Sequence, residues 1–363
     1  MMPLSPKYRL PFLILGLISL IAGLATGLSR LGVSTPEIYQ SVSGLHSAFM
    51  ISSFFGTLIG LERAVATRYW WAYLAPLLSG LAGLSLLILM QGSSVAPLLL
   101  MLASAIFTLA SGMIVLKQTA LFTITLWLAA TLWFCGNTLW LLSNILWSSI
   151  PFGLSFLVLT IAGERLELTR FMRPRPSAKR LFIALLILMI VGSVKSGLSG
   201  FVENDLLGLG FAGLAIWLLN FDIARKTIRQ TGLTRFVAAC LLSGYLWLLL
   251  GGMLLAMTGN AAFSIYQMDA AVHAIALGFI FSMVIGHAPI IFPAIMRIAI
   301  PYSDRMYAPL ALLHLGVAIR ISGDLLAEPT IRTLGGSLNV LALLAFILTL
   351  LLQVRAGWRK SLL

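Results

Sequence analysis

The feature that most constrains this chain is a succession of apolar stretches, each about as long as a lipid bilayer is thick. A helix needs roughly 20 apolar residues to cross the hydrocarbon core. Charged residues make up only 10% of the chain, whereas a soluble domain carries about a quarter. The sequence therefore predicts an all-α integral membrane protein, a bundle of about twelve transmembrane helices forming one polytopic domain over residues 1–363. The predicted spans are 10–28, 42–61, 71–90, 95–116, 120–142, 145–163, 180–198, 205–223, 236–257, 268–292, 307–327 and 331–353.

The positions of the basic residues support this division. If the amino terminus lies inside, every one of the 24 Lys and Arg residues falls on the inner side except Arg30, Lys195, Arg320 and Arg332. An excess of Lys and Arg on the cytoplasmic side orients membrane helices, so both termini are predicted to be cytoplasmic. The net charge of +13 then reflects topology and contacts with anionic lipid heads, not nucleic-acid binding. We expect a multi-pass protein of a bacterial cytoplasmic (inner) membrane.

All four histidines fall inside predicted spans, where an ionisable side chain is costly and is usually functional. His46 and His273 each lie about five residues into a helix that enters from outside, which is about 7 Å below the outer hydrocarbon boundary. His287 lies about 21 Å deeper than His273 on the same helix, within about 40° of the same face. His314, on the next helix, shares the depth of His287. The four histidines thus form an outer and an inner pair.

Two facing neutral imidazoles can ligate a metal ion or the two faces of a haem. A b-type haem needs no covalent motif, and the sequence contains no C-x-x-C-H. Imidazole suits haem iron and copper alike, so His287 and His314 are predicted to hold a second haem or a copper ion, without a choice between the two. The simpler alternative for each histidine is a hydrogen bond across helices.

Two segments resemble subunit I of the haem-copper oxidases. LHSAFMISSFFGTLIG, residues 45–60, is similar to the second helix of that family, and AAVHAIALGFIFSMVIGHAPIIFPA, residues 270–294, is similar to its tenth helix. The resemblance implies a haem-copper-oxidase-like bundle in which His46 and His273 are the axial ligands of a low-spin haem b. Ala271 stands where the family carries the histidine that holds its high-spin haem.

The sequence also departs from that family. The predicted spans 145–163 and 180–198 contain no histidine, so the copper ligands have no counterpart and oxygen reduction by that mechanism is not expected. One retained bis-histidine site in twelve helices looks more like the NnrS family, haem-containing membrane proteins linked to nitric oxide. Gly286-His287 is similar to a Gly-His pair in that family. The resemblance implies nitric oxide or quinol as a partner.

Three further charged residues lie in or near the outer parts of these helices. Arg320 and Asp324 are four residues apart and share a helix face, so Arg320 is predicted to bind a haem propionate or to pair with Asp324. Asp269 is predicted to cap its helix, with a propionate or proton-path role as the alternative.

Two other functions remain open from the sequence. Twelve helices, prolines within helices and intramembrane Arg320 also suit a small-solute transporter without haem. A third possibility is an assembly or sensor protein that binds haem without redox work. Whether the protein is an enzyme is not decided by its sequence.

Overall fold

The computed structural model describes residues 4–89, 93–169, 172, 175–258 and 265–361. Within these residues all regular structure is helical, and eleven helices are long and apolar enough to span a membrane. The protein is therefore an all-α multi-pass membrane protein, which confirms the predicted fold class. The spans are Pro6–Arg30, Ala48–Thr67, Trp70–Ile88, Val95–Lys117, Leu121–Ser143, Leu146–Thr169, Pro176–Leu198, Gly232–Met257, Ile265–Met296, Asp304–Leu325 and Pro329–Gly357.

The remaining predicted span, 205–223, is the shorter helix α9 (Asp205–Phe221) of 17 residues. It measures about 26 Å at about 1.5 Å per residue, a little less than a hydrocarbon core of roughly 30 Å. Asp205 begins the helix and Asp222 follows it, so acidic residues bound the apolar run at both ends. Three residues used in the sequence analysis, residue 90, Arg170 and Arg173, lie outside the described residues.

The chain divides into two compact units, each described here by itself. Unit 1 comprises Met1–Glu164 and Ser193–Phe201, and unit 2 comprises Arg165–Gly192 and Val202–Leu363. The sequence prediction of one membrane domain over residues 1–363 stays a prediction.

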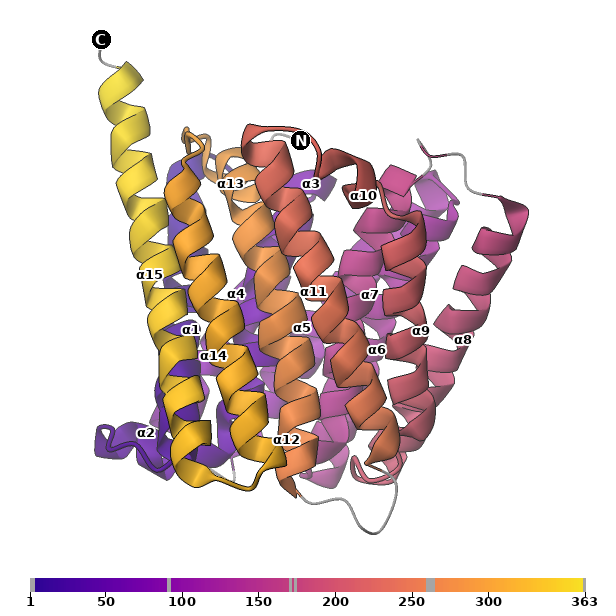
Figure 1. The fold of residues 1–363 in the computed structure, drawn as a ribbon, viewed down its shortest axis with the longest axis vertical. Helices are drawn as coiled ribbons and strands as arrows, with labels where there is room; N and C mark the ends of the chain where they lie inside the picture. Colours follow the sequence, from indigo (N-terminus) through magenta and orange to yellow (C-terminus); the bar gives the residue numbers. More distant parts are fainter. Residues whose placement is uncertain (1–3, 90–92, 170–171, 173–174, 259–264, 362–363) are drawn as a thin grey trace. The chain divides into compact units, whose positions relative to one another are not determined.

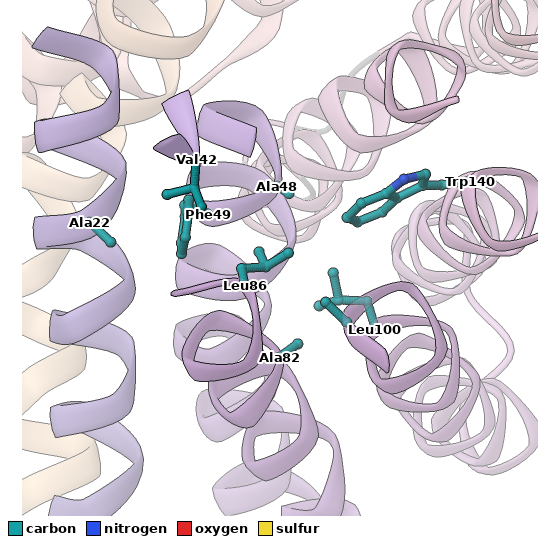
Figure 2. Close-up of a cluster of buried hydrophobic side chains, with 9 residues drawn as sticks. Ala22, Val42, Ala48, Phe49, Ala82, Leu86, Leu100 and Trp140 are labelled. Atoms are coloured by element: carbon teal, nitrogen blue, oxygen red, sulfur yellow. The ribbon is translucent and has the colours of Figure 1, made fainter. Parts of the chain in front are cut away.

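Unit 1 is organised around a π-helix. Figure 2 shows Ala48 and Phe49, the first residues of η3, packed among apolar side chains of the neighbouring helices. Small residues allow this close approach, because a Cβ at Gly83 would lie 2.4 Å from the hydroxyl of Ser53 in η3. The elements of unit 1 are α1 (Leu10–Arg30), α2 (Glu37–Ser41), the π-helix η3 (Ala48–Phe55), α3 (Gly56–Thr67), α4 (Leu74–Ile88), α5 (Val95–Lys117), α6 (Leu121–Ser143) and most of α7 (Ile150–Thr169), with short 3₁₀ turns between them.

Unit 2 contains a second π-helix, η7, in the middle of a long span. Helices α14 and α15 lie side by side in Figure 1, as do α9 and α11. The elements of unit 2 are most of α8 (Pro176–Leu198), α9, α10 (Ala224–Thr227), α11 (Gly232–Met257), α12 (Ile265–His273), the π-helix η7 (Ala274–Phe281), α13 (Ser282–Met296), α14 (Tyr307–Leu325) and α15 (Pro329–Ser361).

Large apolar side chains are exposed along the spans of both units. Leu142 is 76% exposed, and Leu348 is 57% exposed. In water such surfaces would associate, whereas in a bilayer they contact lipid. This exposure agrees with the low charge of the chain and with a membrane environment.

Candidate functional site

His46 is held against a neighbouring helix of unit 1. Its Nδ1 lies 2.8 Å from the carbonyl oxygen of Gly23 in α1. A carbonyl oxygen only accepts, so Nδ1 carries the ring proton and Nε2 carries the lone pair. The imidazole lies over Gly27, where a Cβ would approach Cε1 to 3.0 Å and Nδ1 to 3.2 Å. The position of the ring therefore depends on a glycine one helix turn beyond its acceptor.

His273 is held within its own helix in unit 2. Its Nδ1 lies 2.9 Å from the carbonyl oxygen of Asp269 and 3.3 Å from a carboxylate oxygen of the same residue. Both contacts place the proton on Nδ1 and the lone pair on Nε2. A carboxylate behind an imidazole fixes ring orientation and raises the basicity of the far nitrogen, which is a common arrangement behind a metal-ligating histidine.

Both histidines precede a π-helix, which the sequence analysis did not anticipate. The π-helix η3 begins two residues after His46, η7 begins directly after His273, and each has eight residues. π-Helices are rare and frequently occur at functional sites. Their apolar residues resemble those of the adjoining α-helices, so hydropathy gives no signal for them.

A buried ion cluster surrounds Asp269. Its carboxylate accepts from Arg320 Nη2 at 2.8 Å and from Arg332 Nη2 at 3.0 Å. Arg332 Nε also lies 2.6 Å from the Asp324 carboxylate, although the angle of this ion pair falls outside hydrogen-bond geometry. The formal charges of the two aspartates and the two arginines cancel, as expected for charge placed within a membrane span.

Two expectations about these residues are corrected. Arg320 binds Asp269 of another helix rather than Asp324, its neighbour in sequence. Asp269 lies inside α12 and does not cap it. The reason is the close contact of α14 with α15, where a Cβ at Gly335 would lie 2.2 Å from the backbone nitrogen of Arg320. That contact brings Arg332 into the cluster and separates the pair that sequence spacing favoured.

One buried N–H donor of Arg320 is unsatisfied in the described part of the protein. Its Nε is buried and has no hydrogen-bond partner within the described ranges of the chain, while Nη2 donates to Asp269. A buried guanidinium N–H normally has an acceptor. This unsatisfied donor is compatible with the predicted role of Arg320 toward a carboxylate of a bound group.

The inner pair of histidines differs in its ring protons. His287 Nδ1 lies 2.8 Å from the carbonyl oxygen of Met283, so His287 carries its proton on Nδ1. His314 Nδ1 instead accepts a hydrogen bond from the indole Nε1 of Trp247 at 2.9 Å. Within the described residues, no group of three or more His, Cys, Asp and Glu side chains is arranged to hold a metal ion. A two-histidine site at His287 and His314 stays a prediction.

A second buried ion pair in unit 2 was not singled out from the sequence. Arg165 donates to both carboxylate oxygens of Asp222, at 2.7 and 2.9 Å. Asp222 also accepts from the Tyr245 hydroxyl at 3.1 Å and the Ala224 backbone N–H at 2.6 Å. Both carboxylate oxygens of Asp222 therefore accept hydrogen bonds, and the ion pair joins helices of unit 2. An acidic residue directly after an apolar run is the only signal that the sequence offered.

Unit 1 contains a chain of polar side chains beside the His46 helix. Trp133 Nε1 donates to the Ser52 hydroxyl at 3.1 Å, and Ser52 donates to Asn137 Oδ1 at 3.1 Å. These three residues and Ser47 line a small pocket. These hydrogen bonds satisfy the polar groups in this part of the core.

Comparison with known proteins adds a family but no activity. The family model described as "Domain of unknown function (DUF8744)" matches residues 9–355. No curated protein matches the chain. Because the match covers nearly the whole sequence, this chain belongs to the DUF8744 family.

Proposed function

We propose that the protein binds a b-type haem in a bacterial cytoplasmic membrane, with His273 and His46 as the axial ligands. The observation that carries the proposal is the local arrangement that the two histidines share. Each precedes an eight-residue π-helix, and each holds Nδ1 against an oxygen acceptor. An axial imidazole needs a fixed ring and a lone pair on Nε2, and the Nδ1 contacts within each unit supply both.

Arg320 is the proposed partner of a haem propionate. Its unsatisfied Nε supports this role, because a charge-assisted bond to a carboxylate is the strong form of such a contact. Asp269 holds the other end of the guanidinium and at the same time orients His273. The ion cluster would thus connect the His273 imidazole, which ligates the haem iron, to Arg320, which binds a propionate of the same haem.

The proposed role is electron transfer or nitric-oxide handling. A bis-histidine haem, when bound, supplies one-electron exchange, and the proposed electron donor in the membrane is a quinol. The link to nitric oxide rests on the sequence resemblance alone. The absence of copper-site histidines from the predicted spans 145–163 and 180–198 argues against oxygen reduction by the copper mechanism.

We further propose a second haem or a copper ion at His287 and His314, which requires that Nε2 of each ring carries no proton. A metal bonds to a ring nitrogen that carries no proton. His314 accepts from Trp247 through Nδ1, so ligation through Nε2 would require the opposite tautomer and the loss of that hydrogen bond. His287 already has its proton on Nδ1 and meets the requirement.

The alternative function, a small-solute transporter without haem, is favoured by one observation. The cluster of Asp269, Arg320, Arg332 and Asp324 lies near the ends of three spans, and charged residues within spans often mark a transport path. The two functions differ in colour, because a transporter without haem has no Soret band.

The test is the absorption spectrum of the detergent-purified protein, oxidised in air and reduced with dithionite, together with a pyridine haemochrome assay of haem per chain. We expect a sharp α-band in the reduced state. His273→Ala should lose the haem, and Trp217→Phe in the same unit, whose Nε1 donates to the Ala178 carbonyl, should retain it as the control. A protein that stays colourless when haem is supplied during expression would reject the proposal and favour transport.

A further inference from the structure

The four histidines differ in one respect that bears on binding. His46, His273 and His287 each hold Nδ1 against a carbonyl oxygen, so their lone pair lies on Nε2. His314 has the opposite arrangement. The first three are suited to be ligands of a metal, and the fourth is suited to donate a hydrogen bond.

The tautomer of His314 follows from the chemistry of its partner. The indole Nε1–H of Trp247 can only donate, and it lies 2.9 Å from His314 Nδ1. Nδ1 is therefore the acceptor, and the proton of the neutral ring is on Nε2. The two rings lie nearly parallel, with centroids 6.3 Å apart and 18° between their planes.

Trp247 is itself fixed by the second π-helix. A Cβ at Gly278 of η7 would lie 2.4 Å from Trp247 Cγ, so the indole packs directly on that glycine. This contact restricts the indole and thereby holds its N–H toward His314. The tautomer of His314 is thus set by packing within unit 2.

The Nε2–H of His314 has no acceptor among the residues that the structure describes. Nε2 is buried and lacks a hydrogen-bond partner. In a membrane span no bulk water satisfies such a donor, and buried donors are almost always paired. Because no described residue supplies an acceptor, this donor calls for one from a bound molecule.

We propose that His314 donates a hydrogen bond through Nε2–H to a neutral oxygen acceptor bound in unit 2, and that Trp247 sets the tautomer that allows it. A neutral acceptor is expected because the neutral imidazole contributes no charge. The acceptor is either a buried water or the carbonyl of a lipid-soluble compound such as a quinone. Trp247 and His314 are each only partly buried, so this side-chain pair is not fully enclosed by the protein.

This inference does not depend on the proposed haem. It uses only residues of α11, η7 and α14, and His46 and His273 have no part in it. It competes with metal binding at His314, which requires Nε2 without a proton.

The test is solid-state nitrogen NMR of the full chain in lipid bilayers with ¹⁵N-labelled histidine, any haem being kept in its reduced diamagnetic state. Four histidines give few signals, and His314→Asn identifies those of His314. We expect protonated Nε2 and unprotonated Nδ1 for His314, and the reverse for the other three. A wild-type spectrum in which all four histidines carry their proton on Nδ1 would overturn the proposal, whether or not any variant folds.

Trp247→Phe then tests whether the Trp247 indole sets the tautomer of His314. Without the indole donor, the Nε2 signal of His314 should move toward the unprotonated range. Trp217→Phe is the matched control, because Trp217 Nε1 donates to the Ala178 carbonyl at 2.8 Å, also within unit 2. The control should leave the His314 signals unchanged. An unchanged His314 tautomer in Trp247→Phe would overturn the role of Trp247.

The acceptor is identified in the same samples. Magnetisation transfer from water to the Nε2 proton indicates a bound water. A saturable shift of the Nε2 signal on adding decylubiquinone indicates a carbonyl, and this shift should be lost in Trp247→Phe. If neither water transfer nor a response to quinone is observed, the donor has no ligand and the proposed binding is rejected.

Discussion

The helices that carry His46 and His273 share one local design and differ in what holds the histidine. In unit 1, the Nδ1 of His46 contacts a backbone carbonyl of another helix, and its ring lies over Gly27. In unit 2, the Nδ1 of His273 contacts its own helix at Asp269, which two arginines bind. One histidine is therefore positioned by close packing and the other by charge.

Because of this difference, different kinds of substitution should displace each histidine. Close packing is sensitive to small changes of volume, because membrane helices approach through small residues. An ion cluster is sensitive to the loss of one partner, because the remaining charges stay buried and unpaired. Substitutions of the two kinds should therefore affect the two histidines separately.

The largest effect is expected at Asp269. Asp269→Ala leaves Arg320 and Arg332 with the single carboxylate of Asp324, and breaking a buried ion pair costs about 3–5 kcal/mol. We expect a lower free energy of unfolding by about that amount, measured by denaturant titration in mixed micelles. In the haem-free protein, the His273 NMR signals should shift and those of His46 should not.

Glu328→Ala is the control for this prediction, because Glu328 is an exposed acid close to the same helices. It should change the free energy of unfolding by no more than about 0.5 kcal/mol. Equal losses in the two variants would mean that the cluster does not stabilise unit 2.

The sequence anticipated the positions of the helices but not these contacts. Hydropathy located the spans because the bilayer requires long apolar runs from any chain that crosses it. The choice of Asp269 as the partner of Arg320 depends on how α12, α14 and α15 pack, and spacing along one helix contains no such information. The π-helices escaped prediction for a related reason, since a change of hydrogen-bond register leaves the apolar composition unaltered.

The histidines show how far sequence reasoning reaches into the site. Depth within a span could be counted from the ends of the apolar runs. The proton on each ring could not, because it depends on a neighbour such as Gly23 or Trp247 that is remote in sequence. The distinction between His287 and His314 therefore needed the structure.

A smaller effect is expected at Gly27, where packing positions His46. A Cβ at Gly27 would lie 3.0 Å from the ring, and added volume in a packed core costs about 1–3 kcal/mol. Gly27→Ala should therefore displace the imidazole, weaken its bond to Gly23 and shift the His46 NMR signals. Under the proposed function, haem per chain should also fall.

Gly16→Ala in the same helix is the matched control, because its Cβ would meet Thr57 Cγ2 at an ordinary 3.5 Å. It should leave the His46 signals and the haem content unchanged. Unaltered His46 signals in Gly27→Ala would show that packing does not fix this ring, and the contrast with His273 would be lost.

The smallest effect on the free energy of unfolding is expected at two serines, each of which joins a π-helix or the residue after it to a neighbouring helix. Ser53 in η3 donates to the Ser79 carbonyl at 2.7 Å and shares a second bond with the Ser19 hydroxyl at 2.8 Å. Ser282, which follows η7, donates to the Cys240 carbonyl at 2.8 Å. Side-chain hydrogen bonds between membrane helices contribute about 0.6 kcal/mol on average.

Ser53→Ala removes two such bonds and Ser282→Ala removes one, so we expect losses of about 1.2 and about 0.6 kcal/mol in the free energy of unfolding. The order of the two values is the informative result, because Ser53 joins η3 to both α1 and α4, whereas the bond from Ser282 reaches α11 alone. A larger loss for Ser282→Ala would mean that the second π-helix relies on this serine more than on its other contacts. In that case the ion cluster around Asp269 would position His273 without holding the helix that follows it.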